Sequence, residues 1–319
     1  MQNRHDHKSA GVSDDSIDRR GFLECMAWVG TGVAWSVRGG VLSSSAFGAD
    51  VKPAEEADFT FVQISDSHIG FSKEPNKDVT ATMRQAAAKI NAMAERPAFL
   101  LHTGDLTHLA KPDEFDTCAQ VVKEAKVGQA FFVPGEHDVF TDDAKSYLQR
   151  YGKGTQGTGW HSFDYKGVHF IGLVNVMNLK AGGLGVLGKD QFEWLKKDVA
   201  GLAASTPVVV FAHVPLWTVY EKWGWGTSDS EQALGLLKRF GSVTVLNGHI
   251  HQVLQKVEGA VTFHTACSTA FPQPAPGKAP SPGPVKNVPA EKLKGVLGLT
   301  RVNFVAKKGS LAVVDNSLE

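Results

Sequence analysis

Five apolar stretches of the sequence end in side chains that bind metals or move protons. The first stretch, residues 59–65, runs into Asp66 and His68. The other four end in Gly104-Asp105, Gly135-Glu136-His137-Asp138, His213 and Gly248-His249-Ile250-His251. Carboxylates and imidazoles without thiolates are ligands that suit Mn, Fe, Zn or Mg, and do not suit a structural zinc–cysteine site. The pattern therefore predicts a metal centre at the ends of five strands.

The elements that must position these side chains alternate between strand and helix. Apolar runs predict strands at 59–65, 98–103, 130–134, 208–212 and 243–247. Helical spacing predicts helices at 79–95, 112–125, 189–202 and 230–240. This alternation predicts parallel strands with right-handed crossovers. Ligands of open α/β sheets bind at the carboxyl ends of the strands, so we expect the five motifs to meet there.

Other stretches predict a hairpin, further strands and two notable loops. Lys166-Gly167 marks a hairpin between 160–165 and 168–174, and later strands are expected near 252–257, 260–265, 300–306 and 311–314. The proline-rich stretch 271–289 predicts a long extended loop, either a lid or a surface tether. Trp223-Gly224-Trp225 is a candidate substrate platform, although such loops more often pack against the protein.

Composition excludes several classes of protein. The 319 residues include 33 basic and 33 acidic side chains, so the formal net charge is zero. This balance predicts neither nucleic-acid binding nor a solvating acidic tail. The hydrophobic fraction of 42% suffices for a sizeable core. Cys118 and Cys267 lie outside the N-terminal segment, and the sequence leaves open whether they pair.

The N-terminal segment resembles a twin-arginine export signal. Arg19 and Arg20 precede Phe-Leu and a moderately apolar run that extends to about Phe47. Arg38 interrupts this run, which is too short to predict a stable membrane span. We therefore expect the twin-arginine export machinery as a partner and a periplasmic or secreted location. A disordered N-terminus with a chance arginine pair is the alternative.

The segment sets the predicted division of the chain. We expect the mature domain to begin after a short linker, with cleavage after Ala46 or Ala49. The predicted parts are an export signal and cleavage region at 1–49, a linker at 50–58 and one catalytic domain at 59–319.

The order of the five motifs resembles that of the calcineurin-like metallophosphoesterases. That family carries Asp-x-His, Gly-Asp, Gly-Asn-His-Asp/Glu, a lone His and Gly-His-x-His, and the match here spans 66–251. Gly-Asp-Leu-Thr after Asp-x-His resembles the cyclic-nucleotide-phosphodiesterase-like branch. The resemblance implies a four-layer α/β/β/α sandwich of two mixed β-sheets. It also implies hydrolysis of a small phosphomonoester or phosphodiester substrate by two metal ions, Fe, Mn or Zn.

The resemblance implies a role for each motif residue. One metal would be held by Asp66, His68, Asp105 and His251. The second would be held by Asp105, Glu136, His213 and His249. Asp105 would bridge the metals, and a hydroxide between them would be the nucleophile. His137 would protonate the leaving oxygen or stabilise developing charge, and Asp138 would orient His137.

Two positions depart from the family pattern. Glu136 stands where the family has Asn, so we expect tighter metal retention and a less electrophilic second metal. Glu136 could instead swing aside, or the chain could be a non-catalytic periplasmic protein that binds metal or phosphate. His108 stands where the purple acid phosphatases carry a tyrosine ligand, and it could lie at the rim of the cleft. The histidines without motif support are predicted to be structural: His102, His161, His169 and His264.

Overall fold

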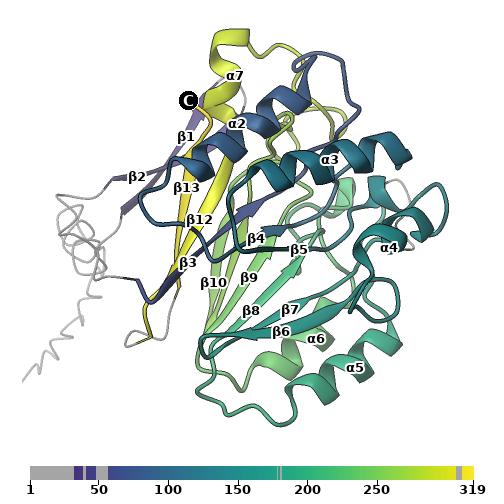
Figure 1. Cartoon of the computed structure of the whole chain (residues 1–319), viewed down its shortest axis with the longest axis vertical. Coiled ribbons are helices and arrows are strands. Elements are labelled where there is room, and N and C mark those ends of the chain that lie inside the picture. Colours follow the sequence, from purple (N-terminus) through teal and green to yellow (C-terminus); the bar gives the residue numbers. More distant parts are fainter. Residues whose placement is uncertain (1–31, 39–40, 48–56, 178, 180–181, 307–310) are drawn as a thin grey trace, which may run out of the picture.

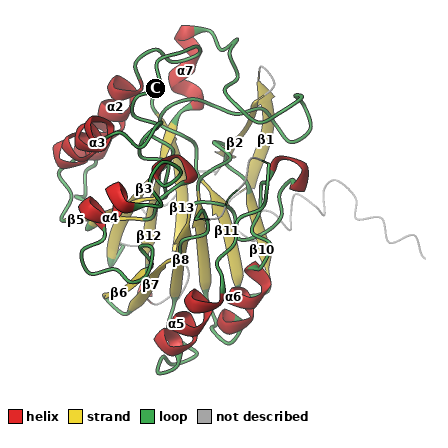
Figure 2. Cartoon of the chain, turned by 90° about the vertical axis from the view of Figure 1, so that its right-hand side faces the viewer, coloured by secondary structure: helices red, strands yellow, loops and turns green. Residues whose placement is uncertain are grey.

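Two mixed β-sheets pack face to face, and helices cover the outer face of each (Figures 1 and 2). This computed structural model describes residues 32–38, 41–47, 57–177, 179, 182–306 and 311–319. The four layers α/β/β/α are the fold class that the motif resemblance implies, and that prediction is confirmed.

The five-stranded sheet has the order β13-β12-β3-β4-β5. Its parallel strands are β3 (Phe59–Ile64), β4 (Phe99–His102) and β5 (Gln129–Phe132). Two antiparallel strands complete one side, β12 (Gly298–Phe304) and β13 (Leu311–Ser317). The crossovers α2 (Val79–Asn91) and α3 (Pro112–Glu124) pack on its outer face (Figure 1).

The six-stranded sheet has the order β10-β11-β9-β8-β7-β6. Four inner strands run parallel: β7 (Val168–Gly172), β8 (Val208–Ala212), β9 (Val243–Asn247) and β11 (Val261–Thr265). The edges are antiparallel, β6 (His161–Tyr165) and β10 (Gln255–Glu258). Its outer face is covered by α5 (Lys189–Val199) and α6 (Ser230–Leu237).

Aromatic side chains fill the space between the sheets. Phe61 and Phe99 stack with ring centroids 5.0 Å apart, and Phe170 of the other sheet meets Phe99 edge-on at 5.1 Å. All three are fully buried, and each such side chain stabilises the fold by roughly 1.5–3 kcal/mol. Every residue of β3 is buried because helices cover one face and the second sheet covers the other.

Several short elements differ from the sequence expectation. The sequence did not predict α4 (Lys145–Tyr151), η1 (Glu136–Asp138), η2 (Glu221–Trp223), α7 (Ala290–Val296) or the hairpin of β1 (Gly32–Arg38) and β2 (Val41–Phe47). Helices of one or two turns repeat the helical period too few times to be recognised. The helices α2, α5 and α6 end three or four residues before their predicted ends.

The predicted export signal lies largely outside the described residues. Arg19 and Arg20 fall in 1–31, and most of the predicted linker falls in 48–56. The division into signal, linker and domain therefore stays a prediction. Among the described helices, none has the length and apolarity to cross a membrane. Cys118 and Cys267 do not pair with each other.

A histidine between two carboxylates joins β6, β7 and α5. Nδ1 of His169 lies 2.8 Å from Asp164 Oδ1, and Nε2 lies 2.9 Å from Asp198 Oδ2. Burial opposes protonation of the ring, but hydrogen bonds to the two carboxylates outweigh it and raise the pKa of His169. The two carboxylates thus favour the protonated ring, which links an edge hairpin to a covering helix.

This contact predicts a pH-dependent stability. A raised folded pKa gives stability that is fully present below the unfolded pKa of about 6.5 and is lost as the pH rises through the folded value. The difference in free energy of unfolding between wild type and His169→Asn should therefore shrink from about pH 6 to about pH 8 in urea titrations.

His161→Asn provides the matched control. Burial lowers the pKa of His161, so its difference from wild type should grow over the same pH range. If the difference in free energy of unfolding from wild type changed with pH in the same direction for both variants, the raised pKa assigned to His169 would be contradicted.

Candidate metal centre

The candidate ligands lie where strands of both sheets end. The strands β3, β4, β5, β8 and β9 lead respectively into Asp66-Ser67-His68, Asp105, Glu136, His213 and His249-Ile250-His251. Two hydrogen bonds between the sheets hold these strand ends together. Gln63 Nε2 donates to the carbonyl of Asn247 at 3.2 Å. His213 Nδ1 donates to the carbonyl of Thr103 at 2.7 Å.

One group of ligand atoms surrounds the Nε2 atoms of His68 and His251. These nitrogens lie 3.2 Å apart. Asp66 Oδ1 lies 3.2 Å from His251 Nε2, and Asp105 Oδ2 lies 3.4 Å from His68 Nε2. All four residues are buried, so their polar atoms meet each other rather than water.

A second group lies on the other side of Asp105. Glu136 Oε2 is 2.9 Å from His213 Nε2, and Glu136 Oε1 is 3.1 Å from His249 Nδ1. Asp105 Oδ2 is 3.5 Å from His213 Nε2. The structure thus brings all seven sequence-predicted ligands together, with Asp105 near a histidine of each group.

The hydrogen bonds of the rings test whether this donor set fits metal ions. His251 Nδ1 donates to the carbonyl of Phe271 at 2.6 Å, as His213 Nδ1 does to Thr103. A neutral ring that donates from Nδ1 carries a lone pair on Nε2. These lone pairs face carboxylates, because His213 Nε2 lies 2.9 Å from Glu136 Oε2 and His251 Nε2 lies 3.2 Å from Asp66 Oδ1. Cations between these atoms would satisfy them, so the residues present fit the two metal ions.

Protons compete for the same positions. Burial opposes protonation of His213, but the negative charges of Asp105 and Glu136 outweigh it and raise its pKa well above the usual range. Burial would raise the pKa of Glu136, but His249 and His213 hold it well below its usual range. Metal binding would therefore release protons from this cluster.

Backbone strain is concentrated at the ligands. The structure places nine non-glycine residues at positive φ within its described part, and five of them are Asp66, His68, Asp105, His249 and His251, with φ from 41° to 71°. Each such conformation costs on the order of 1–3 kcal/mol and clusters at functional sites. The two-residue spacing of Asp-x-His and His-x-His is thus held in strained turns.

Two motif glycines are required for close approach. A Cβ atom on Gly135 would overlap the carboxylate of Asp105, and one on Gly248 would overlap Ser65 Oγ and the carboxylate of Asp66. Glycine supplies the backbone approach that no other residue allows. These two motif glycines are therefore required because a larger residue would displace the ligand side chains.

His137 lies beside the candidate ligands, and its ring lines a pocket. Its backbone N–H donates to Asp105 Oδ1 at 2.9 Å, and its Nδ1 donates to the carbonyl of His108 at 2.8 Å. Burial opposes its protonation, but Asp105 and Glu136 raise the pKa of His137. With Nδ1 engaged, Nε2 is the nitrogen of His137 left for a substrate.

The predicted role of Asp138 as the partner of the His137 ring is wrong. Its carboxylate instead accepts hydrogen bonds from four donors at 2.8–3.0 Å: the backbone N–H groups of Leu106, Thr107 and Gly135 and the Thr107 hydroxyl. Burial and the charge of Asp105 raise the pKa of Asp138 to about 7. Asp138 therefore joins the loops after β4 and β5, and the His108 carbonyl orients His137.

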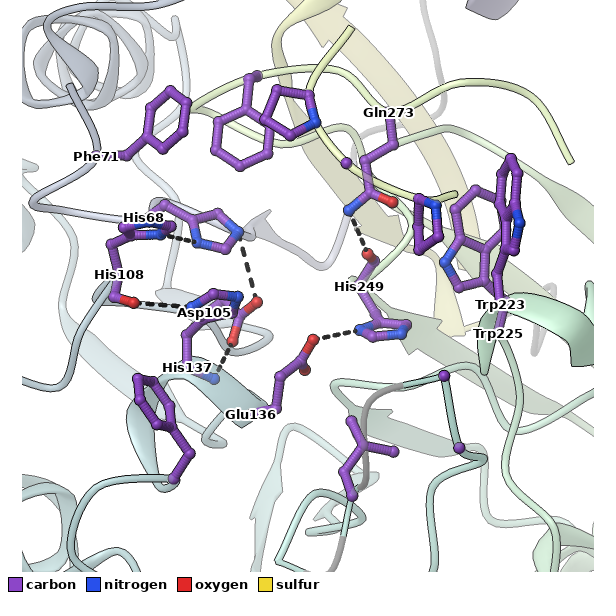
Figure 3. Close-up of a pocket in the computed structure, with 18 residues that line it drawn as sticks. His68, Phe71, Asp105, His108, Glu136, His137, Trp223, Trp225, His249 and Gln273 are labelled. Carbon is purple, nitrogen blue, oxygen red and sulfur yellow. Dashed lines mark hydrogen bonds and ion pairs between the residues drawn. The ribbon is translucent and has the colours of Figure 1, made fainter. Parts of the chain in front are cut away.

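A pocket of about 390 Å³ opens on the site (Figure 3). Its polar end is formed by the centre, and its other walls are mainly aromatic, glycine and proline residues. Phe140 is 58% exposed and meets the His137 ring edge-on at 5.9 Å. Among the described residues of the lining, which leave out 178, 180 and 181, there is no lysine or arginine. The pocket can thus hold an ester whose organic part is apolar.

The start of the proline-rich loop covers the centre, which the sequence did not reveal. Phe271 stacks on His68 with centroids 4.8 Å apart and lies 4.7 Å from the His251 ring. Gln273 Nε2 donates to the His249 carbonyl at 3.2 Å. Phenylalanine and glutamine are not typical metal ligands, and these two residues belong to no sequence motif. Only the length of the loop indicated a possible function.

The tryptophan loop packs mainly against the protein. Trp223 and Trp225 are 7% and 1% exposed and meet edge-on at 4.9 Å. They pack against Ile250 and also line the pocket. Packing against the protein, the commoner of the two roles expected for this loop, therefore accounts for most of the surface of both side chains.

Comparisons with known proteins point to one family. The family model described as calcineurin-like phosphoesterase matches residues 59–253. The chain is 24% identical to a glycerophosphodiester phosphodiesterase of Enterobacter lignolyticus, over 66% of this chain and 77% of that protein. It is 23% identical to a probable cyclic nucleotide phosphodiesterase of Rhodococcus erythropolis, over 66% and 71%. A dimetal phosphatase from Danio rerio has a similar fold, with a TM-score of 0.62, 14% identity and coverage of 83% and 98%.

Metal addition and removal test the donor set. A ligand that binds only the folded state stabilises it by about 2.7 kcal/mol at 100 times its dissociation constant. Mn, Fe or Zn should therefore raise the Tm of the apoprotein, and a chelator should reverse the shift. Asp105→Asn should lose most of this shift, because Asp105 lies between both groups of ligand atoms.

Asp190→Asn is the control, since Asp190 is an exposed carboxylate on α5. The donor set is contradicted if Asp105→Asn and Asp190→Asn retain the same metal content by elemental analysis.

Proposed function

The chain belongs to the calcineurin-like phosphoesterase family, and we propose that this metal-dependent phosphoric ester hydrolase is an exported phosphodiesterase. The candidate ligands would hold two metal ions, which would supply Lewis acidity and an acidified water as the nucleophile. The proposal rests on the buried cluster of carboxylates and ring nitrogens that meet around Asp105. We further propose the ligand roles that the motif resemblance implies.

The chain itself supplies binding, orientation and a proton donor. Asp66, Asp105 and Glu136 provide the carboxylates, and strained turns hold the first two of them. His137 presents Nε2 toward the pocket because its Nδ1 is held by the His108 carbonyl. A protonated His137 in this place can protonate the leaving oxygen as a general acid. The exposed ring of Phe140 lies beside it for an apolar leaving group.

Charge favours a diester over a monoester. The carboxylates of Asp66, Asp105 and Glu136 with two divalent ions would leave a net charge of about +1. A phosphodiester carries one negative charge, whereas a phosphomonoester approaches two at neutral pH. The lining residues that the structure describes add no lysine or arginine that could offset a second negative charge. A diester is therefore the better electrostatic match.

Export through the twin-arginine pathway is the remaining part of the proposal. It is supported by Arg19, Arg20 and the apolar run that follows them. That pathway carries folded proteins, so the metal centre would be loaded before export. The periplasm or the medium would be the place of action.

Hydrolysis and metal content measured on one preparation test the activity. We expect about two metal ions per chain and faster turnover of bis-p-nitrophenyl phosphate than of p-nitrophenyl phosphate, because the loaded site carries little excess positive charge. Absence of turnover with both esters after Mn, Fe or Zn is added would instead favour a non-catalytic protein that binds metal or phosphate.

Replacing Glu136 tests the charge argument. Glu136→Asn and Glu136→Gln both remove a negative charge, which contributes on the order of 1–4 kcal/mol at about 4 Å. Both should shift the ratio of kcat/KM values toward the monoester by roughly tenfold or more. Glu136→Gln removes the charge but keeps the length of the side chain, so a comparison with Glu136→Asn distinguishes the effect of charge from the effect of side-chain length. An unchanged ratio in both variants would refute the electrostatic basis of the preference, and activity only in Glu136→Asn would identify the wild type as non-catalytic.

Cell fractionation tests export. A variant with Arg19→Lys and Arg20→Lys should accumulate as an unprocessed cytoplasmic form, because the paired arginines are the feature that the pathway recognises. Arg4→Lys, a matched change elsewhere in the N-terminal segment, should be exported like wild type. Equal export of all three proteins would remove this part of the proposal.

A further inference from the structure

His108 contacts both a candidate metal ligand, His68, and the candidate general acid, His137 (Figure 3). Its Nδ1 is 3.5 Å from Nδ1 of His68, and its ring stacks on His137 with centroids 5.0 Å apart and 16° between the planes. We propose that His108 Nδ1 accepts a hydrogen bond from Nδ1–H of His68 and that His108 presents its own Nε2–H to an oxygen of the bound phosphate ester. This inference rests on the proposed phosphodiesterase function.

The contacts of His68 fix the position of its proton. Its Nε2 faces the ligand group, 3.2 Å from His251 Nε2 and 3.4 Å from Asp105 Oδ2. A ring that coordinates through Nε2 keeps its proton on Nδ1 and donates it to a neighbouring acceptor. For His251 and His213 that acceptor is a backbone carbonyl. In the described part of the chain, the partner of His68 Nδ1 is the imidazole of His108.

The acceptor role in turn fixes the tautomer of His108. A ring nitrogen that accepts a hydrogen bond carries a lone pair, so the proton of His108 must lie on Nε2. The ring is then neutral and has one N–H left to donate. A neutral donor adds no charge to a site whose loaded charge already matches a phosphodiester.

The surroundings hold this ring in place at the pocket. The backbone N–H of His108 donates to the Ile69 carbonyl at 2.9 Å, and its carbonyl accepts from His137 Nδ1. Phe71 meets the ring edge-on at 5.2 Å. His108 is only partly buried and lines the pocket beside His137. Its free N–H is therefore positioned to reach a substrate rather than the protein core.

Three substitutions separate the two contacts of the ring. Asparagine can place an oxygen near the position of Nδ1, glutamine can place an amide N–H near Nε2, and phenylalanine keeps only the ring. His108→Asn should thus retain the contact with His68 and lose the donor to the substrate. His108→Gln should do the reverse, and His108→Phe should lose both.

Metal affinity and turnover are measured on each variant. Loss of a partner of a ligand histidine typically weakens metal binding about 10–100-fold, so we expect at least about tenfold weaker Mn or Zn binding by chelator competition for Gln and Phe, and little change for Asn. At saturating metal, kcat for bis-p-nitrophenyl phosphate should fall by about tenfold or more for Asn and Phe, and less for Gln. His161→Asn, on β6 and outside the pocket lining, should change neither quantity.

The two arms fail separately. Equal metal affinity in all variants would overturn the contact with His68, and equal kcat would overturn the contact with substrate. If the wild type hydrolyses no ester, the proposed function fails, while the metal arm still decides whether His108 supports His68. Wild-type turnover with unchanged variants would overturn this inference alone.

Discussion

Carboxylates and imidazole lone pairs are forced together in a buried space, and the rest of the site depends on this crowding. Asp66, Asp105 and Glu136 approach ring nitrogens at 2.9–3.5 Å. Desolvated groups of this kind are unfavourable unless cations or protons are shared among them. The centre is thus arranged for ions, and the strain of its turns is maintained by the folded protein around it.

The sandwich provides the stability that this arrangement requires. A stacked aromatic core joins the two sheets, so that strands from both end at the same edge. Gln63 and His213 then bond across the sheets to carbonyls of the opposite strand ends. The ligands follow the strand ends directly, so the two packed sheets set their separations. Short links of this kind favour preorganisation over closure on binding.

The loops after β4 and β5 act as one unit. Asp138 accepts hydrogen bonds from both loops, which fixes Asp105 and Glu136 relative to each other. The same unit carries His108 and His137, whose rings stack at the polar end of the pocket. The proposed acid, the proposed neutral donor and two ligands therefore share one support.

Residue type and spacing in the sequence were enough to predict the strand ends and the side chains that meet there, and the motif resemblance implied the fold class. The ability of Asp66, Asp105 or His213 to bind a metal depends on the residue type alone. The strand that ends before each of them is recognised as an apolar run. The role of Asp138 was predicted wrongly, because the sequence cannot show that four donors already occupy its carboxylate. Phe271 was missed because a ring over a metal centre has no pattern along the chain.

The sequence by itself therefore determined which chemical groups the protein brings to its site. Only the tertiary structure decided which nitrogen of each ring is free, because the partner of the other nitrogen comes from a distant loop. His137 is oriented by a carbonyl 29 residues away, and His251 by one 20 residues away on the proline-rich loop. Hydrogen-bond partners of this kind depend on positions in space, which packing of the two sheets sets and local sequence does not record.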